Sequence, residues 1–305
     1  EQYRTGNGYY LGMPQDFDAQ YAIDTKRFWH FLEETQGDEI DKLKATNPQY
    51  KLALIQRLDK MAKKYGILTF LRKGFDIDNS HFKLFYTPPL ASSSQAVKDN
   101  FERNEFSVTR QLRYSTQNKL EEIDLVIFVN GLPIITIELK NQWTGQNAKI
   151  HGQKQYKGRD TKETLLQFGR CLVHFAVDTD EVYMTTKLNG KDTFFLPFNQ
   201  GFNHGQGNPP NAFGYKTDYL WNEIFTRKSI GNIIQHFVRF DGEPKDALKK
   251  RTLFFPRYHQ MDVVRKIIKD IAQKGVGQKY LVQHSAGSGK SNSITWAAYQ
   301  LIEVY

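Results

Sequence analysis

The sequence predicts a mixed α/β protein with two domains, and three observations support this. The chain has 305 residues, more than the roughly 100–200 residues of an ordinary domain. Five apolar, β-rich runs between residues 106 and 188 are interrupted by a polar, helix-like stretch at 146–156, as expected for a mixed sheet with a helix between its strands. A glycine-rich turn at 285–291 separates an apolar run from a helical pattern, which indicates that a second α/β unit begins near the C-terminus.

The individual elements follow from residue spacing and from turn residues. Apolar positions at three- and four-residue steps predict a helix over 47–64 that ends at Gly66, and serines that can cap a first turn predict a helix over 94–104. Further helices are expected near 218–225, 229–237 and 255–271, and from 292 onward. The expected strands are 67–71, 82–86, 106–114, 123–129, 133–140, 171–178, 182–188 and 279–284. The glycine-rich stretch 201–214 is expected to be a loop.

A charged segment, Asp241-Gly242-Glu243-Pro244-Lys245, is the predicted linker between the two domains. It separates a first domain, residues 1–240 with its core at about 94–190, from the beginning of a second domain, residues 241–305.

Composition narrows the class of protein. The net charge of +9 and the isoelectric point near 9.3 favour a polyanionic partner, because lysine and arginine side chains that neutralise phosphates release bound counterions. No apolar run reaches the roughly 18–20 residues of a membrane span, so we expect no membrane partner. Residues 1–4 do not resemble a secretory signal, which favours the cytoplasm. The single cysteine, Cys171, lies in an apolar run, where we assign it no chemistry.

Acidic and basic groups on two apolar strands form the first candidate site. Asp124 lies on one strand, and Glu138 and Lys140 lie on the next. Hydrolysis of a phosphodiester requires oxygen ligands for Mg²⁺ and a nearby cation, which these three side chains supply. The alternative is that they only occupy solvent-exposed strand positions. Strands this apolar on both faces are typical of buried strands, where ionisable groups are costly unless they are paired or bound to metal.

The turn between these strands tests the metal interpretation. Glu138 and Lys140 are two residues apart and therefore lie on one face of their strand. If Asn130-Gly131 formed a simple two-residue turn, Asp124 would lie opposite Ile137, on the other face. A metal shared by Asp124 and Glu138 therefore predicts an odd-length loop or a β-bulge.

Basic residues gather after these strands and suit the phosphates of DNA, although an ordinary solvated surface is the alternative. They are Lys149, Lys154, Lys157, Arg159 and Lys162.

The glycine-rich turn near the C-terminus is the second candidate site. An apolar run at 279–284, the turn and a helix predict a loop whose backbone N–H groups cradle phosphates, with Lys290 reaching their outer oxygens and Ser291 holding Mg²⁺. His284 stands where the usual pattern has its first glycine. The loop consists of Gly287, Ser288, Gly289, Lys290 and Ser291 after Ser285 and Ala286.

The strand pair around Asp124 and Glu138 resembles the PD-(D/E)xK nuclease superfamily and, more narrowly, the restriction subunit of type I restriction-modification enzymes. The resemblance implies that Asp124 and Glu138 are Mg²⁺ ligands and that Lys140 is the catalytic cation. Related nucleases add a Gln-x-x-x-Tyr motif, whereas this chain has Gln153 and Tyr156, one residue closer together. Gln153 and Tyr156 are therefore further catalytic candidates, although both could simply line a solvated helix face.

The turn Ala286-Gly287-Ser288-Gly289-Lys290-Ser291 resembles motif I of superfamily 2 helicases, which bind ATP. The resemblance makes Gln260 the residue that reads adenine, with Arg257 and Tyr258 as its neighbours. The implied fold is a mixed-sheet PD-(D/E)xK nuclease followed by the first strand, loop and helix of a RecA-like helicase domain. No acidic second motif or second motor lobe precedes Tyr305, so we expect only the beginning of a motor.

The order of the two motifs, from about residue 102 to the C-terminus, favours the type I restriction subunit, an ATP-dependent site-specific deoxyribonuclease. The resemblance implies double-stranded DNA as substrate, Mg²⁺ and ATP as cofactors, and methyltransferase and specificity subunits as partners. Two alternatives remain open at this point. One is a repair-type helicase-nuclease that works without a methyltransferase, and the other is a non-catalytic DNA-binding or assembly module.

Overall fold

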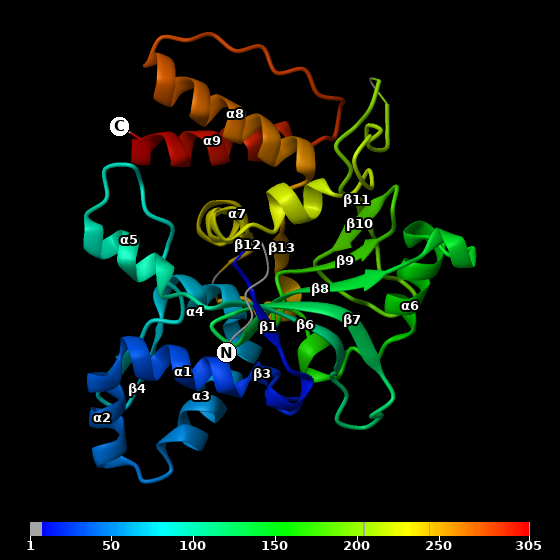
Figure 1. Cartoon of the computed structure of the whole chain (residues 1–305). Helices are drawn as coiled ribbons and strands as arrows, with labels where there is room; N and C mark the ends of the chain where they lie inside the picture. The colour runs from blue at the N-terminus through cyan, green and yellow to red at the C-terminus, as the bar shows by residue number, and fades with distance from the viewer. Residues whose placement is uncertain (1–7, 204, 244, 305) are drawn as a thin grey trace.

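A seven-stranded mixed sheet forms the centre of the protein, whose computed structural model describes residues 8–203, 205–243 and 245–304 (Figure 1). Its strand order is β1-β6-β7-β8-β9-β10-β11, with β1 parallel to β6, β8 parallel to β9, and the other neighbours antiparallel. The strands are β1 (Tyr10–Gly12), β6 (Phe106–Arg113), β7 (Glu122–Val129), β8 (Leu132–Leu139), β9 (Val173–Val177), β10 (Val182–Thr185) and β11 (Leu196–Pro197). The predicted mixed α/β class and the five predicted strands between 106 and 188 are confirmed.

Four helices follow β1 along the chain and pack on one side of the sheet. They are α1 (Thr25–Thr35), α2 (Gly37–Thr46), α3 (Tyr50–Tyr65) and α4 (Ile67–Lys73). The helix predicted over 47–64 is confirmed as α3, and it ends at Gly66, whose φ of 80° suits glycine. The strand predicted at 67–71 is wrong, because α4 buries Ile67, Phe70 and Leu71 at helical spacing, and short apolar runs do not distinguish the two structures.

Segment 82–86 was expected to be a strand, but only Phe82 belongs to one, as the last residue of β5 (Ser80–Phe82), which pairs with β4 (Phe75–Ile77). Beyond it the backbone N–H groups of Lys83 and Tyr86 donate to the side chains of Gln36 and Asn104. Side-chain acceptors thus replace a neighbouring strand. The helix predicted over 94–104 is confirmed as α5 (Gln95–Glu102), whereas the predicted serine cap is wrong, since the Ser94 side chain makes no capping hydrogen bond.

The two faces of the sheet bury separate clusters of side chains. One face carries Ile135, Ile137 and Phe175 against the N-terminal helices and against α7 (Arg227–Asn232) and η6 (Ile233–Phe237). The other carries Val126 and Ala176 under η3 (Ala148–Gly152) and α6 (Gln153–Gly158). The helical stretch expected at 146–156 is therefore confirmed, and it covers the face that bears Glu138. The helices expected near 218–225 and 229–237 are confirmed as η5 (Leu220–Ile224), α7 and η6.

The C-terminal segment leaves the sheet through a short hairpin. Strands β12 (Arg239–Asp241) and β13 (Thr252–Phe254) pair across the predicted linker, of which Pro244 lies outside the described residues. Helices α8 (Tyr258–Lys274) and α9 (Lys290–Val304) follow, at the opposite end of the molecule from α1–α3 in Figure 1. Trp296 of α9 packs on Phe237 of η6, so α9 contacts the helical segment that packs on the sheet.

The strand predicted at 279–284 does not form, and this prediction is wrong. Leu281 is 95% exposed, and no strand in the described parts of the chain pairs with this segment. A β-strand depends on a neighbour that accepts and donates its backbone hydrogen bonds. The remaining small elements are η1 (Pro14–Asp16), β2 (Phe17–Asp18), β3 (Ile23–Asp24), η2 (Gln142–Thr144), η4 (Thr164–Leu166) and η7 (Leu248–Lys250).

Stretch 201–214, outside of His204, which lies beyond the described residues, contains no helix or named strand, as predicted for a loop. Residues 1–4, on which the expectation about a secretory signal depended, also lie outside the described residues. Among the helices of the described segments, none has the length and apolar character needed to cross a bilayer.

Candidate active site

The hairpin of β7 and β8 contains the β-bulge that the sequence predicts. Val129 pairs with Leu132 and Phe128 with Pro133, but Ile127 pairs with Ile135, so Ile134 has no partner opposite it. Because of this extra residue, Leu125 lies opposite Ile137. The next residues in register, Asp124 and Glu138, therefore share one face of the sheet. The predicted bulge is confirmed.

Glu138 lies on this face near the end of β8 and is fully buried, with 0% of its surface exposed. Its Oε1 is bound by the guanidinium of Arg159. Burial raises the pKa of Glu138 to about 7, and Arg159 opposes this shift while the nearby Asp124 adds to it. A buried acid with an opposing cation and a neighbouring carboxylate is the arrangement that a bound metal ion would stabilise in its charged form.

Asp124 is partly exposed, and its carboxylate is held in place by the backbone of the next strand. Its Oδ2 accepts a hydrogen bond of 2.7 Å from the Leu139 N–H. This bond crosses from β7 to β8 next to Glu138, which restricts the direction of the Asp124 side chain and leaves its other oxygen directed away from that bond.

The two carboxylates fit a hard divalent cation. Glu138 Oε2 is buried and has no hydrogen-bond partner, although buried polar atoms nearly always have one. Mg²⁺ commonly takes one or two protein carboxylates and completes its shell with water and substrate phosphate. Within the described residues no group of three or more His, Cys, Asp or Glu side chains could hold a metal. Asp124 and Glu138 are the residues that could hold such an ion, whose remaining positions would be open to water and substrate.

Lys140 follows Glu138 on the same face, and its Nζ donates to Gln155 Oε1 on α6. The structure thus places Gln155 beside Lys140, whereas the sequence comparison had selected Gln153. In the described segments the Gln153 side chain makes no hydrogen bond to the protein, although it is only partly exposed. The motif did not indicate Gln155, because Lys140 and Gln155 lie on different elements and meet only through the packing of α6 against the sheet.

Tyr156 lies beneath the site and does not face solvent. It is fully buried, and its hydroxyl forms a 2.8 Å hydrogen bond with Thr136 Oγ1, which also bonds to His174 Nδ1 at 2.7 Å. Burial raises the pKa of Tyr156 far above its usual value and lowers that of His174 to about 3. Tyr156 therefore supports the strand that carries Glu138, and both rings remain neutral at physiological pH.

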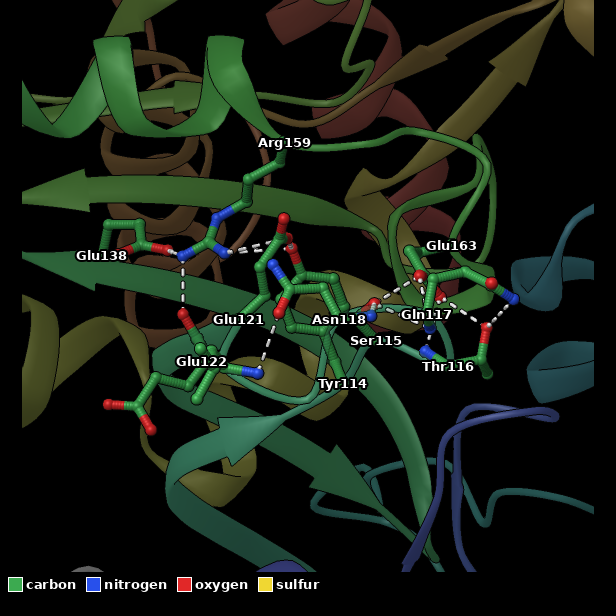
Figure 2. A network of polar contacts seen from close by, with 11 residues as sticks. Tyr114, Ser115, Thr116, Gln117, Asn118, Glu121, Glu122, Glu138, Arg159 and Glu163 are labelled. Atoms are coloured by element: carbon green, nitrogen blue, oxygen red, sulfur yellow. Dashed lines mark hydrogen bonds and ion pairs between the residues drawn. The ribbon is translucent and has the colours of Figure 1, made fainter.

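Arg159 joins the ends of three strands around Glu138 (Figure 2). Besides Glu138, its guanidinium donates to the Glu122 carbonyl at 2.7 Å and to the Tyr114 hydroxyl at 3.0 Å. Glu121 lies 3.9 Å from the same group and accepts from Tyr114. Arg159 was expected to contact DNA phosphates, and this is wrong, since the residue is only 8% exposed. No local pattern signals its role, because its partners lie on distant strands.

An open cavity of about 460 Å³ lies beside Lys140 and Arg159. Its wall also contains Glu121, His151, Lys154 and Gln155. Of the basic residues expected to face DNA, Lys149, Lys154 and Lys162 are exposed and Lys157 is partly exposed. The two carboxylates thus lie next to a surface rich in lysine, which suits an anionic polymer.

The glycine-rich turn precedes α9, whose first residue is Lys290. Gly287 and Gly289 have φ angles of 71° and 81°, a region that favours glycine. Lys290 Nζ donates to the carbonyls of His284 and Ser285, at 3.2 and 2.9 Å. Ser291 is exposed, whereas Ser288 is buried and its Oγ has no partner.

Gln260 lies against this turn, with its Nε2 2.9 Å from the Ser288 carbonyl and its Oε1 accepting from the Arg257 N–H. The structure therefore brings Gln260, Arg257 and the loop together. Tyr258 faces away, since its ring packs on Tyr219 and its hydroxyl accepts from Gln200. The loop contains glycines and is followed directly by a helix. However, the side chains of Lys290 and Gln260 contact backbone carbonyl groups of the loop or of the residues just before it.

The sequence profile described as type I restriction enzyme R protein N terminus matches residues 28–193. The chain is 25% identical over 205 residues to the putative type I restriction enzyme MjaVIIIP endonuclease subunit of Methanocaldococcus jannaschii. This alignment covers 65% of this chain and 18% of that protein. It is 23% identical over 275 residues to the type I restriction enzyme HindI endonuclease subunit of Haemophilus influenzae. This alignment covers 86% of this chain and 25% of that protein.

These alignments span a quarter or less of the relatives' own length. The profile match begins at residue 28, well before the motifs. It therefore includes most of α1 and all of α2–α4, for which the motifs offered no explanation.

Proposed function

Because this chain belongs to the type I restriction enzyme R protein N-terminal family, we propose that it is part of an ATP-dependent restriction endonuclease subunit and carries its DNA-cutting site. The observation that carries the proposal is the bulge between β7 and β8, which brings Asp124 and Glu138 to one face, followed by Lys140. The matched relatives are named as endonuclease subunits of type I restriction enzymes, which supports the same activity.

In this proposal residues 1–240 form a nuclease domain of the PD-(D/E)xK type. Asp124 and Glu138 would hold Mg²⁺, which supplies charge neutralisation of the scissile phosphate and a more acidic bound water. Lys140, fixed by Gln155, points its ammonium group along the same face, where it can orient the attacking water or offset negative charge on the phosphate. The exposed lysines of α6 and its flanks would bind the DNA backbone.

The segment 241–305 is proposed as the beginning of a RecA-like helicase motor. The loop at 287–291 would bind the phosphates of ATP through its backbone N–H groups and Lys290. For this, the Lys290 ammonium must exchange its contacts with His284 and Ser285 for the nucleotide. In the whole enzyme, Mg²⁺ and ATP would be cofactors, double-stranded DNA the substrate, and methyltransferase and specificity subunits the partners.

The test uses the full-length subunit assembled with its partner subunits. Cleavage of plasmid DNA and hydrolysis of ATP are followed together for the wild type, Asp124→Ala and Lys140→Ala, with Mg²⁺ present. Loss of cleavage with ATP hydrolysis retained supports a separate nuclease site. Cleavage unchanged in both variants contradicts the assignment, and a subunit that cuts without methyltransferase and specificity subunits would favour a repair-type helicase-nuclease instead.

A further inference from the structure

We propose that Arg159 is a positioning residue that determines which Glu138 oxygen is open to the metal ion. The inference rests on the proposed function. It concerns a residue that does not contact DNA or Mg²⁺ itself and that acts through the Glu138 carboxylate. The structural basis is the set of contacts drawn in Figure 2, where the guanidinium of Arg159 lies between Glu138 and the strand ends of β6 and β7.

Arg159 is held in one orientation from several directions. It follows the last residue of α6, and its backbone N–H donates to the Tyr156 carbonyl at 3.2 Å. Its planar guanidinium then donates to the Glu122 carbonyl and the Tyr114 hydroxyl, and it lies over the Tyr114 ring, 5.3 Å from the ring centre. The donors of a planar guanidinium have fixed directions, so arginine orients a bound carboxylate in a way that a lysine ammonium does not.

The contact with Arg159 makes the two carboxylate oxygens of Glu138 different. Oε1 is occupied by the Arg159 guanidinium, whereas Oε2 is buried and has no hydrogen-bond partner. Since Asp124 shares the face with Glu138, the free Oε2 is the oxygen available to a shared cation. Residues that orient a metal ligand commonly change metal affinity about 10–100-fold when they are replaced.

If Arg159 had only a structural role, replacing it should have the same effect as replacing another buried arginine that forms an ion pair. Another buried arginine ion pair joins Arg170 to Asp59 on α3, and the Arg170 side chain is 3% exposed. Arg170 lies before β9 and contacts none of Asp124, Glu138 or Lys140 among its hydrogen bonds and ion pairs. It is therefore a matched control for the general cost of disturbing a buried arginine pair.

Metal binding also distinguishes positioning by Arg159 from competition between Arg159 and the cation. If Arg159 only filled the metal position until the cation displaced it, removing the guanidinium would remove a competitor and strengthen metal binding. Positioning requires the opposite sign, because Glu138 would lose the contact that directs its free oxygen. The direction of the change in affinity thus decides between the two arrangements.

The test measures Mn²⁺ binding by electron paramagnetic resonance on the full-length subunit without nucleotide or DNA, so that it does not depend on activity. The proteins are the wild type, Asp124→Asn, Arg159→Met, Arg159→Lys and Arg170→Lys. We expect the Kd of the Asp124-dependent site to rise about tenfold or more in both Arg159 variants and to stay unchanged in Arg170→Lys. Thermal unfolding establishes that each protein is folded, and Arg159→Lys decides the question if Arg159→Met is not.

Equal or tighter Mn²⁺ binding in Arg159→Lys overturns the positioning role while leaving the proposed nuclease site intact. Absence of any Asp124-dependent Mn²⁺ site in the wild type overturns the proposed function as well. Cleavage provides a second readout, since raising the Mg²⁺ concentration should restore Arg159→Lys but not Lys140→Ala. Failure of that rescue, with Mn²⁺ affinity unchanged, also contradicts the proposal.

Discussion

Leu125 lies directly opposite Ile137, whereas a regular ladder continued from the turn, where Val129 pairs with Leu132, would place Leu125 opposite Thr136. The difference is one residue, Ile134, which has no partner opposite it. In an antiparallel pair, opposite residues point to the same side, so the shift of one residue brings the side chains of Asp124 and Glu138 together. The position of two acids therefore depends on a backbone irregularity several residues away.

The turn that begins this hairpin should be intolerant of a side chain at Gly131. Its φ is +76°, and an added Cβ would lie 2.4 Å from the Asp24 carbonyl oxygen and 2.6 Å from the Phe28 nitrogen. Gly131→Ala should lower the free energy of unfolding by more than about 2 kcal/mol, measured by urea denaturation. Gly145→Ala is the control, because Gly145 has a φ of +71° but open space around it, so only about 1 kcal/mol is expected. Equal losses in the two variants would contradict the steric explanation.

Gln155 should matter more than Gln153 for DNA cleavage. Gln155 accepts a hydrogen bond from Lys140, so Gln155→Ala frees the proposed catalytic cation to move. We expect a fall in cleavage rate of about tenfold or more, as is usual when a positioned catalytic group is loosened. Gln153→Ala should leave the rate within about twofold of the wild type. Single-turnover cleavage by the assembled enzyme measures both, and a larger loss for Gln153→Ala would reverse the assignment.

Tyr156 should be needed for stability and not for catalysis. Its hydroxyl is buried against Thr136 and has no access to the face where DNA would bind. Tyr156→Phe should lower the free energy of unfolding by about 1 kcal/mol, the usual value of one such hydrogen bond, and retain wild-type cleavage. Unfolding and cleavage assays on the same preparation test this. A variant that is stable but fails to cut would show that the hydroxyl takes part in the reaction.

The raised pKa of Glu138 predicts that, without metal, the difference in stability between Glu138→Gln and the wild type grows as pH rises. Burial raises this pKa from 4.5 to about 7, so the folded state retains a proton that the unfolded state has released between these values. The sign is therefore a loss of stability as pH rises from about 4.5 to 7. Relative to the wild type, Glu138→Gln should gain about 3 kcal/mol between pH 4.5 and pH 8.

Denaturant unfolding of both proteins across this pH range measures the difference, in which contributions shared by the two proteins, such as that of His174, cancel. Added Mg²⁺ should stabilise the wild type at pH 8 and reduce the gap. A difference that is independent of pH would mean that Glu138 is already ionised in the folded protein without metal.

Several features follow from local sequence alone. Apolar runs on both sides of the Asn130-Gly131 turn predict the β7–β8 hairpin. Asp124 and Glu138 differ by one residue in their distance from this turn, so a bulge is required if the two acids meet. Gly66 likewise predicts the end of α3. Such features are local because hydrogen bonds in a turn and the alternation of strand faces involve residues close together in the chain.

The tertiary structure alone decided the rest. It placed the bulge at Ile134, brought Arg159 to Glu138, selected Gln155 for Lys140, buried Tyr156, and left segment 279–284 without a strand partner. Each of these depends on contacts between segments far apart in sequence, where packing and the pairing of buried charges outweigh local preference. The sequence by itself determined which chemical groups the site contains, and the packing of α6 against the sheet determined which of them meet.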